Sequence, residues 1–145
     1  MNNSSLFDNT SFYESFRKDL SKAYELVVIE SPFITTRRVE NLMPIIRRLR
    51  KRDVRVIINT RPPEEHDEAY AFQAENAISS MQSIGVKVLY TIRHHRKVAI
   101  VDDILWEGSL NILSHSDSCE IMRRTVSSVL TNEMMRFTGV ANYVA

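Results

Sequence analysis

Residue types that can act on a phosphodiester gather between residues 93 and 102 and again shortly afterwards. His95 and Lys97 alternate, so on an extended strand their side chains point to the same face. Ser109 and Asn111 lie at the end of the second strand of a predicted hairpin and also share a face if that strand persists. One face would therefore carry an imidazole, an ammonium, a hydroxyl and a carboxamide. The ammonium would offset the anionic oxygens of a phosphodiester, the neutral donors would bind them with direction, and the imidazole could attack phosphorus or transfer a proton.

The order of these residues resembles a family signature. Gly108 precedes the serine and would let a ligand approach the backbone closely. The pattern resembles the HxKx4D…GSxN motif of the phospholipase D superfamily and its downstream acid, at His95, Lys97, Asp102, Gly108, Ser109, Asn111 and Glu120. The spacing between its two halves is one residue shorter than is usual in the family, which a shorter hairpin would absorb. The resemblance covers most of the chain and points to single-motif, nuclease-like bacterial members.

The resemblance implies a role for each matching residue. His95 resembles the nucleophile that forms a phosphohistidine intermediate. Lys97 and Asn111 resemble the phosphate-binding pair, with Ser109 as an additional donor. Glu120 resembles the acid that accepts a hydrogen bond from the histidine ring and fixes its tautomer.

The last motif residue is expected to be structural, and no metal-binding pattern accompanies the motif. Asp102 resembles the aspartate of the motif, which we interpret as structural support for its loop. The sequence has no clustered set of carboxylates and no His/Cys ligand spacing, so we expect no metal ion or other cofactor.

The resemblance also implies a second copy of the chain. Phospholipase D chemistry uses two such motifs, because one histidine attacks phosphorus and the other protonates the leaving oxygen. This chain has one, since neither His66 nor His115 is followed two residues later by a lysine. We therefore expect a homodimer through the active-site face, in which an isologous interface brings both copies of His95 to one phosphate.

A run of basic residues over 47–52 closes a predicted helix and allows two interpretations. One is a solvated helix end that interacts favourably with the helix dipole. The other is a patch that contacts successive phosphates. In the second case the nucleic-acid-binding residues would be Arg47, Arg48, Arg50, Lys51, Arg93 and Arg96.

The apolar pattern predicts the elements that position these residues. Helical spacing of apolar residues predicts helices over about 11–24, 39–49, 70–81 and 129–137. Apolar runs predict strands over 26–29, 54–58, 86–90, 97–101, 104–107 and about 120–126. Pro44 would kink the second helix or delay its start. The order of elements predicts an α/β domain, and the resemblance implies an α/β/α layered phospholipase D-like domain with a central mixed β-sheet flanked by helices.

Length and composition set the class of protein. The chain has 145 residues, of which 43% are hydrophobic and 26% charged, so we expect one globular domain over 11–145 after a flexible segment over 1–10. No apolar run approaches the roughly 18 residues that a membrane span needs. The start of the chain has no signal-peptide pattern and the single cysteine fits a reducing compartment, so we expect a cytoplasmic protein.

Three side chains are expected to be structural. His94 would lie on the face opposite to His95, in packing or on the surface. Trp106 would belong to the core, and Cys119 would be a small buried hydrophobe.

Three classes of function fit these observations. The one we favour is a nuclease that cleaves DNA, or RNA, without a metal ion. A nucleic-acid-binding module without activity comes second and a lipid phosphodiesterase third, because no amphipathic or lipidated segment indicates stable membrane association. Residues 108–124 are also similar to phospholipase D-like domains that are fused to bacterial helicases or work beside them, which implies a helicase as a further partner.

Overall fold

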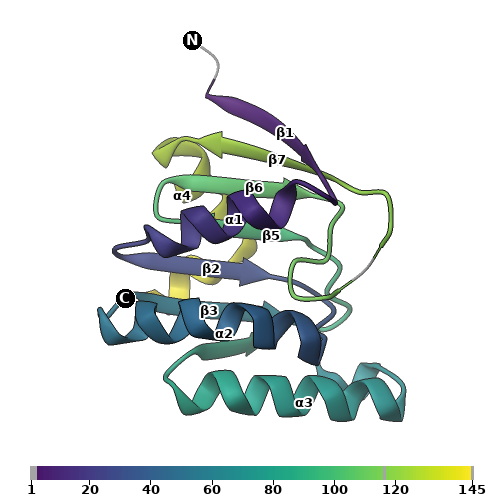
Figure 1. Cartoon of the computed structure of the whole chain (residues 1–145). Helices are drawn as coiled ribbons and strands as arrows, with labels where there is room; N and C mark the ends of the chain where they lie inside the picture. Colours follow the sequence, from purple (N-terminus) through teal and green to yellow (C-terminus); the bar gives the residue numbers. More distant parts are fainter. Residues whose placement is uncertain (1–2, 116, 145) are drawn as a thin grey trace.

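A mixed β-sheet forms the centre of the molecule in the computed structural model, which describes residues 3–115 and 117–144. Within these residues the strand order is β1-β7-β6-β5-β2-β3-β4 (Figure 1). The strands are β1 (Ser4–Asp8), β2 (Leu26–Glu30), β3 (Arg55–Thr60), β4 (Lys87–Tyr90), β5 (Val98–Val101), β6 (Ile104–Gly108) and β7 (Ile121–Val126). The helices are α1 (Phe12–Ser21), α2 (Thr36–Lys51), α3 (Glu68–Ser83) and α4 (Ser128–Thr138), with short 3-10 helices η1 (Pro63–Glu65) and η2 (Val140–Tyr143).

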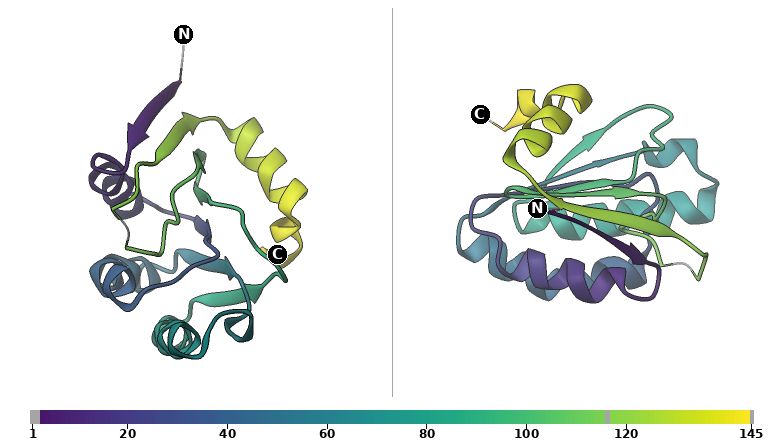
Figure 2. Two further views of the ribbon diagram at one scale, coloured as in Figure 1. Left: turned by 90° about the vertical axis from the view of Figure 1, so that its right-hand side faces the viewer. Right: turned by 90° about the horizontal axis from the view of Figure 1, so that it is seen from above.

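Helices cover both faces of the sheet. Figure 2 shows α1, α2 and α3 on one face and α4 on the other. The predicted α/β/α layering is therefore confirmed. None of the described helices is long and apolar enough to cross a bilayer.

The pairing of the strands decides which residues meet at each edge. Strand β2 pairs in parallel with β3 and antiparallel with β5, and β3 pairs in parallel with β4. The β5–β6 and β6–β7 pairs are antiparallel. The carboxyl ends of β2, β3, β4 and β6 therefore lie beside the amino ends of β5 and β7. We use the name motif edge for this end of the strands, not for an outer strand of the sheet; it is on the right in Figure 1.

The first strand lies where the sequence predicts no element. Residues Ser4–Asp8 form β1 and pair in register with β7, so the domain begins earlier than residue 11 and the expected flexible segment is wrong for this stretch. Leu6 is 57% exposed, and Phe7 contacts the ring of Trp106 at 5.0 Å between centroids. Backbone pairing, the Phe7–Trp106 contact and a hydrogen bond from Arg123 to Ser4 Oγ at 2.6 Å hold the strand, and none of these requires a hydrophobic periodicity.

The second helix passes through its proline. Helix α2 begins at Thr36, eight residues before Pro44, which excludes the late start that the sequence allowed. The side-chain carbonyl of Gln73 accepts the N–H of Thr36 at 2.7 Å. This contact joins the first turn of α2 to α3 at the motif edge.

The core occupies both faces of the sheet. On the α1–α3 face, Phe12, Phe16 and Trp106 are fully buried and pack ring against ring. On the α4 face, Val28 and Ile100 pack with Met135 of the helix. The burial of Trp106 is confirmed, whereas Cys119 is exposed and the expectation that it is buried is wrong. It lies in the loop that leads into β7, two residues before that strand begins.

A buried carboxylate joins α1 to the sheet. Asp19 is 8% exposed and accepts from Trp106 Nε1 at 2.9 Å. It also accepts two hydrogen bonds from the guanidinium of Arg124, at 2.8 and 2.9 Å. One side chain therefore satisfies the polar atom of the central tryptophan and an arginine of β7.

A second buried carboxylate lies at the motif edge. Glu30, at the end of β2, is 1% exposed. Arg96 donates to both of its oxygens, at 2.6 and 3.0 Å, and Asn59 Nδ2 donates at 2.6 Å. His94 Nε2 lies 3.8 Å from Glu30 Oε2, which is an electrostatic contact rather than a hydrogen bond.

These neighbours keep Glu30 ionised. Burial alone raises its pKa. The adjacent His94, Arg96 and Asn59 together lower the pKa by more than burial raises it, so that it falls to about 2. The carboxylate form is therefore favoured in the folded state.

Replacing Asp19 with alanine is expected to lower the free energy of unfolding by about 3 kcal/mol, because Trp106 Nε1 and Arg124 lose their acceptor. Urea denaturation measures the change. Glu14→Ala is the matched control, since its 3.6 Å pair with Lys18 is exposed and should contribute less than about 1 kcal/mol. Equal losses in the two variants would contradict the structural role of Asp19.

Replacing Glu30 with glutamine is expected to destabilise the protein in a pH-dependent way. A carboxyl group with a lowered folded-state pKa stabilises the fold fully above its ordinary value of 4.5, and this contribution disappears as the pH falls towards about 2. The difference in unfolding free energy between wild type and Glu30→Gln should therefore shrink across that interval in urea denaturation. A difference independent of pH would show that Glu30 is not ionised in the fold.

Candidate active site

The first half of the motif lies at the amino end of β5. The sequence predicts a strand from Lys97, but β5 begins at Val98, so His95 and Lys97 lie in the segment that enters the strand. The carbonyl of Lys97 accepts the N–H of Gly108 at 3.4 Å, which extends the β5–β6 pairing by one step. His95 is exposed, and Lys97 Nζ donates to the His95 carbonyl at 2.8 Å. An imidazole that solvent can reach therefore stands beside an ammonium.

An open hollow of about 530 Å³ joins the two halves of the motif. Its lining consists of His95, Arg96, Lys97, Val98, Glu107, Gly108 and Ser109. An anionic group in this hollow would meet the ammonium, the imidazole and the hydroxyl, which is the combination that binds and attacks a phosphodiester.

Gly108 is required by the packing of the sheet. A Cβ at this position would lie 2.1 Å from the carbonyl oxygen of Ile121 and 2.9 Å from the Cα of Met122. The backbones of β6 and β7 approach too closely for any side chain. The close approach that the structure shows at this glycine is to the neighbouring strand.

Ser109 continues the contact with β7. Its N–H donates to the carbonyl of Ile121 at 2.9 Å, and its Oγ accepts the N–H of Ile121 at 3.0 Å. The hydroxyl hydrogen has only a long contact of 3.4 Å to the same carbonyl. The serine is thus held in place while its proton can turn towards an anion in the hollow.

Asn111 lies in the loop after β6, because the strand ends at Gly108. It does not line the hollow, and the condition for sharing a face with Ser109, that the strand persists, is not met because β6 ends before both residues. Its Oδ1 is buried and has no hydrogen-bond partner in the described part of the chain. The loop around it is held by the Tyr13 hydroxyl, which donates to the carbonyl of Ile112.

Glu120 lies at the motif edge, immediately before β7, and is half-buried. Its N–H donates to Asn9 Oδ1 at 3.5 Å. Strand β7 is two strands from β5, or about 10 Å at ordinary strand spacing. Among the described residues, the structure therefore places Glu120 near His95 without a hydrogen bond between them.

Asp102 lies at the opposite end of β5 from His95. Its carboxylate accepts three backbone N–H groups, those of Tyr24, Glu25 and Leu26, each at 3.0 Å. Its own backbone is left-handed, with φ of 53°, in the turn between β5 and β6. The residue is separated from His95 by roughly 20 Å of extended chain. As a catalytic residue it is therefore misplaced, whereas its interpretation as structural support agrees with these contacts.

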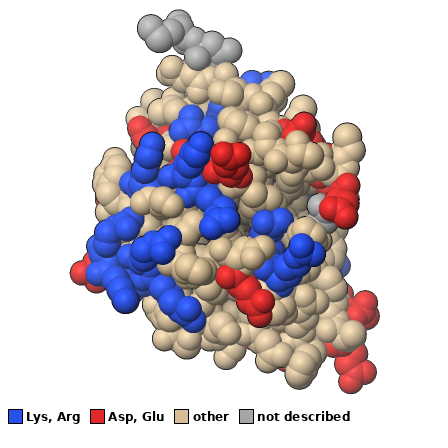
Figure 3. Space-filling model, in the orientation of Figure 1, with Lys and Arg blue, Asp and Glu red and all other residues tan. Residues whose placement is uncertain are grey.

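The basic run is also distant from the motif. Helix α2 starts at the motif edge and ends at the other side of the sheet, about 24 Å away. Figure 3 shows Lys and Arg side chains gathered on the left of this face, over the end of α2. Arg47, Arg48 and Lys51 are exposed there.

Two of the predicted nucleic-acid-binding arginines have structural partners. Arg50 donates to the carbonyls of Val54 and Ile84, at 2.9 and 3.2 Å, and so closes the loops after α2 and α3. Arg96 forms the ion pair with Glu30. Arg93, by contrast, is exposed at the motif edge, and its backbone N–H donates to the carboxylate of Glu65 at 3.0 Å.

Buried polar groups that the sequence pattern does not reveal lie behind the motif. Glu30, Asn59 and His94 are each at most 3% exposed. The sequence pattern does not single out Glu30, and it allows His94 to lie in packing or on the surface. An acidic residue that ends a wholly apolar strand was the available signal for Glu30. The guanidinium of Arg38 lies 3.2 Å from the ring centre of Tyr13, whose hydroxyl donates to the Ile112 carbonyl in the loop of Asn111.

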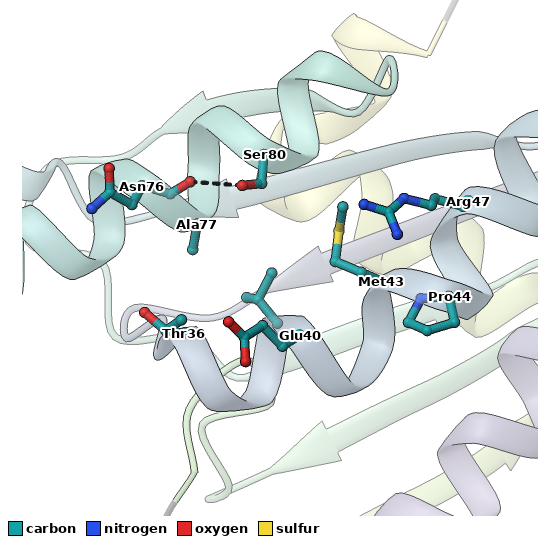
Figure 4. Close-up of a pocket in the computed structure, with 9 residues that line it drawn as sticks. Thr36, Glu40, Met43, Pro44, Arg47, Asn76, Ala77 and Ser80 are labelled. Atoms are coloured by element: carbon teal, nitrogen blue, oxygen red, sulfur yellow. Dashed lines mark hydrogen bonds between the residues drawn. The ribbon is translucent and has the colours of Figure 1, made fainter.

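A separate hollow lies between α2 and α3, away from the motif. Figure 4 shows it lined by side chains of the two helices, including Met43, Pro44 and Ala77. It contains none of the motif residues, so we assign it no part in the chemistry.

One family model and several solved structures match the chain. The family model described as "Cardiolipin synthase, PLD-like domain" matches residues 16–137. Nuc from Salmonella typhimurium, a phospholipase D family member, aligns with a TM-score of 0.75 and 15% identity over 94% of this chain and 91% of its own. NucT from Helicobacter pylori aligns with a TM-score of 0.74 and 21% identity over 99% and 98%.

A third solved structure covers part of a longer protein. TrmBL2, an archaeal chromatin protein, aligns with a TM-score of 0.64 and 10% identity over 99% of this chain and 54% of its own. No curated protein sequence matches the chain. At these identities the solved structures show a shared fold, and the family model covers most of the sequence. The chain belongs to the phospholipase D-like domain family.

Proposed function

We propose that this protein is a phosphodiesterase that cleaves nucleic acid. The observation that carries the proposal is the exposed His95 beside Lys97 in an open hollow at the end of the β5–β6 pair. Membership of the family supports phosphodiester chemistry in general. The imidazole attacks phosphorus, the leaving oxygen departs with a proton, and water then hydrolyses the phosphohistidine. No step of this sequence requires a metal-bound hydroxide.

The neighbouring residues take the remaining roles in the proposal. Lys97 offsets the charge of the phosphate, and Ser109 donates its hydroxyl hydrogen to a non-bridging oxygen. Glu120 and Asn111 act once their side chains turn into the hollow, the first as an acceptor for the imidazole and the second as a phosphate donor. Both lie on the correct edge for this movement.

A second copy of the chain would supply the proton donor. The hollow is open on one side, and among the described residues that line it His95 alone carries an imidazole. Beside it lies an apolar groove between the β5–β6 pair and α4, which shares Arg96, Val98 and Glu107 with the hollow. Phe137 borders this groove and is 83% exposed. An apolar surface next to an incomplete site supports the homodimer through the active-site face.

The charged surface supports a polymeric anion as the substrate. The exposed Arg47, Arg48 and Lys51 are about 17 to 23 Å along α2 from the motif edge, so only a substrate longer than about five stacked nucleotides could reach both. A helicase partner stays a proposal from the resemblance alone.

Binding without cleavage is the second candidate. TrmBL2, which shares the fold, is described by its structure as a chromatin protein with a novel mode of DNA binding. Salt-sensitive DNA binding without cleavage would identify this chain as such a module. Activity on lipid vesicles instead of nucleic acid would identify a lipid phosphodiesterase.

Cleavage of nucleic acid is expected to persist in EDTA and to fall by on the order of 10⁴-fold in His95→Ala, because the variant lacks the nucleophile. Single- and double-stranded DNA and RNA are the substrates, with products separated by gel electrophoresis. Lys18→Ala, an exposed lysine on α1, is the control that should retain activity. Activity that vanishes on chelation and returns with magnesium would contradict the mechanism.

The composite site makes a separate prediction about subunit mixing. Native protein is expected at about twice the 16.8 kDa chain mass in sedimentation, since each site needs two histidines. Heterodimers of tagged wild-type and His95→Ala subunits should be nearly inactive, because each retains one imidazole. Half activity in the purified heterodimer, or full activity in a monomer, would exclude a shared site.

A further inference from the structure

A polar pocket of about 230 Å³ lies beside the proposed active site, between the ends of β3 and β4 and the turn after α4. Its polar and aromatic lining consists of Asn59, Tyr90, Thr91, Thr138, Asn142 and Tyr143. It is smaller than the 300–1,000 Å³ typical of sites for drug-sized ligands, so it suits a single planar ring. We propose that this pocket binds one unpaired nucleobase of the substrate. This inference rests on the proposed function and specifies its substrate.

The lining decides the chemical class of the ligand. Among the described residues, no Lys, Arg, Asp or Glu side chain lines the pocket. A phosphate or an ammonium group would therefore lack a counter-charge there. A neutral ring with hydrogen-bonding edges matches amide and hydroxyl groups, which is how proteins bind unstacked bases.

Two tyrosines provide the surface for stacking. Tyr90 is 49% exposed and Tyr143 is 51% exposed, and both border the pocket. Bases stack on such half-exposed rings whatever their sequence. Lys87 Nζ lies 5.4 Å from the ring centre of Tyr143, outside the pocket lining, where it can approach the backbone of a bound strand.

Asn59 lines the pocket with its side-chain amide held in one orientation. The residue is 3% exposed, its Nδ2 donates to Glu30 at 2.6 Å, and its Oδ1 accepts from Thr91 Oγ1 at 3.0 Å. The orientation of the amide is thus set before a base arrives, which lowers the entropy cost of binding. The same Glu30 binds Arg96, so the pocket and the hollow share one rigid support.

The chain itself connects the pocket to the nucleophile. Thr91 lines the pocket and its N–H donates to the carbonyl of Thr60 at 2.9 Å, while His95 lines the hollow four residues later. Four residues span at most about 14 Å, or about four nucleotides at stacked spacing. Arg93, exposed between them, lies where the intervening phosphates would pass. A base in the pocket therefore places a phosphodiester of the same strand at His95.

This arrangement selects unpaired strands. A paired base is stacked inside its duplex and reaches a pocket only after it is extruded, which costs a few kcal/mol. We therefore expect single-stranded regions to be the preferred substrate.

The test measures binding in a His95→Ala background, so that cleavage does not interfere. Single-stranded DNA and RNA oligonucleotides that contain 2-aminopurine are titrated, and stacking is followed by fluorescence quenching. Tyr90→Ala and Tyr143→Ala are each expected to weaken binding about 5- to 150-fold and to reduce quenching. Tyr24→Ala, which removes a 72% exposed tyrosine at the opposite edge of the sheet, is the matched control and should change neither.

An abasic oligonucleotide tests whether the base itself is bound. It should bind the His95→Ala protein more weakly than the intact strand does, and neither tyrosine substitution should change its affinity. Equal affinities for intact and abasic strands, or tyrosine variants that bind like Tyr24→Ala, would overturn the nucleobase site. An RNA–DNA difference that persists in the abasic strands would assign that preference to the sugar and leave the base site supported.

The failure of the proposed function would look different. Bis(p-nitrophenyl) phosphate has no base, so its cleavage by the wild type tests phosphodiesterase activity alone. Absence of cleavage together with tyrosine-dependent binding would contradict the enzyme and support the pocket. Cleavage without tyrosine-dependent binding would support the enzyme and overturn the pocket.

Discussion

A carboxylate without access to water must be surrounded by donors, and in this protein that requirement organises the motif edge. Glu30 ends β2, yet its donors come from the end of β3 and from the segment before β5. The ion pair with Glu30 fixes Arg96, which lies in the sequence between the proposed nucleophile His95 and the proposed phosphate ligand Lys97. A buried ion pair gives little net stability, but it permits few alternative arrangements of the chain around it. The position of His95 follows from this constraint.

The second half of the motif is positioned by backbone contacts instead of charge. Gly108 allows β6 and β7 to approach closely, and Ser109 then bonds both backbone groups of Ile121. Glu120 immediately precedes that residue, so the acid is tied to the hydroxyl through one shared strand pair. A change in the β6–β7 register would move both together.

Local patterns predicted much of this site, and non-local geometry explains what they missed. His95, Lys97 and Ser109 meet because neighbouring antiparallel strands bring sequence-adjacent residues to one edge, which alternation and a tight turn already indicate. The direction of α2 is a property of the parallel β2–β3 pair, so composition could not show that the run at Arg47 lies far from His95. Strand β1 depends on pairing with a partner more than a hundred residues away, and Glu30 depends on donors from two other segments. No window of sequence contains either relation.

The position of Asp102 changes how the spacing within HxKx4D can be understood. The four residues between Lys97 and Asp102 are the whole of β5, from Val98 to Val101. The lysine stands where the strand enters the sheet, and the aspartate stands where it leaves and ties down the start of β2. The interval therefore equals the length of β5, about 13 Å at ordinary strand rise. One residue more or less would reverse the alternation of side chains along β5 and turn either Lys97 or Asp102 away from its present contacts. The spacing in the motif is therefore set by the length of a strand as well as by the chemistry of its residues.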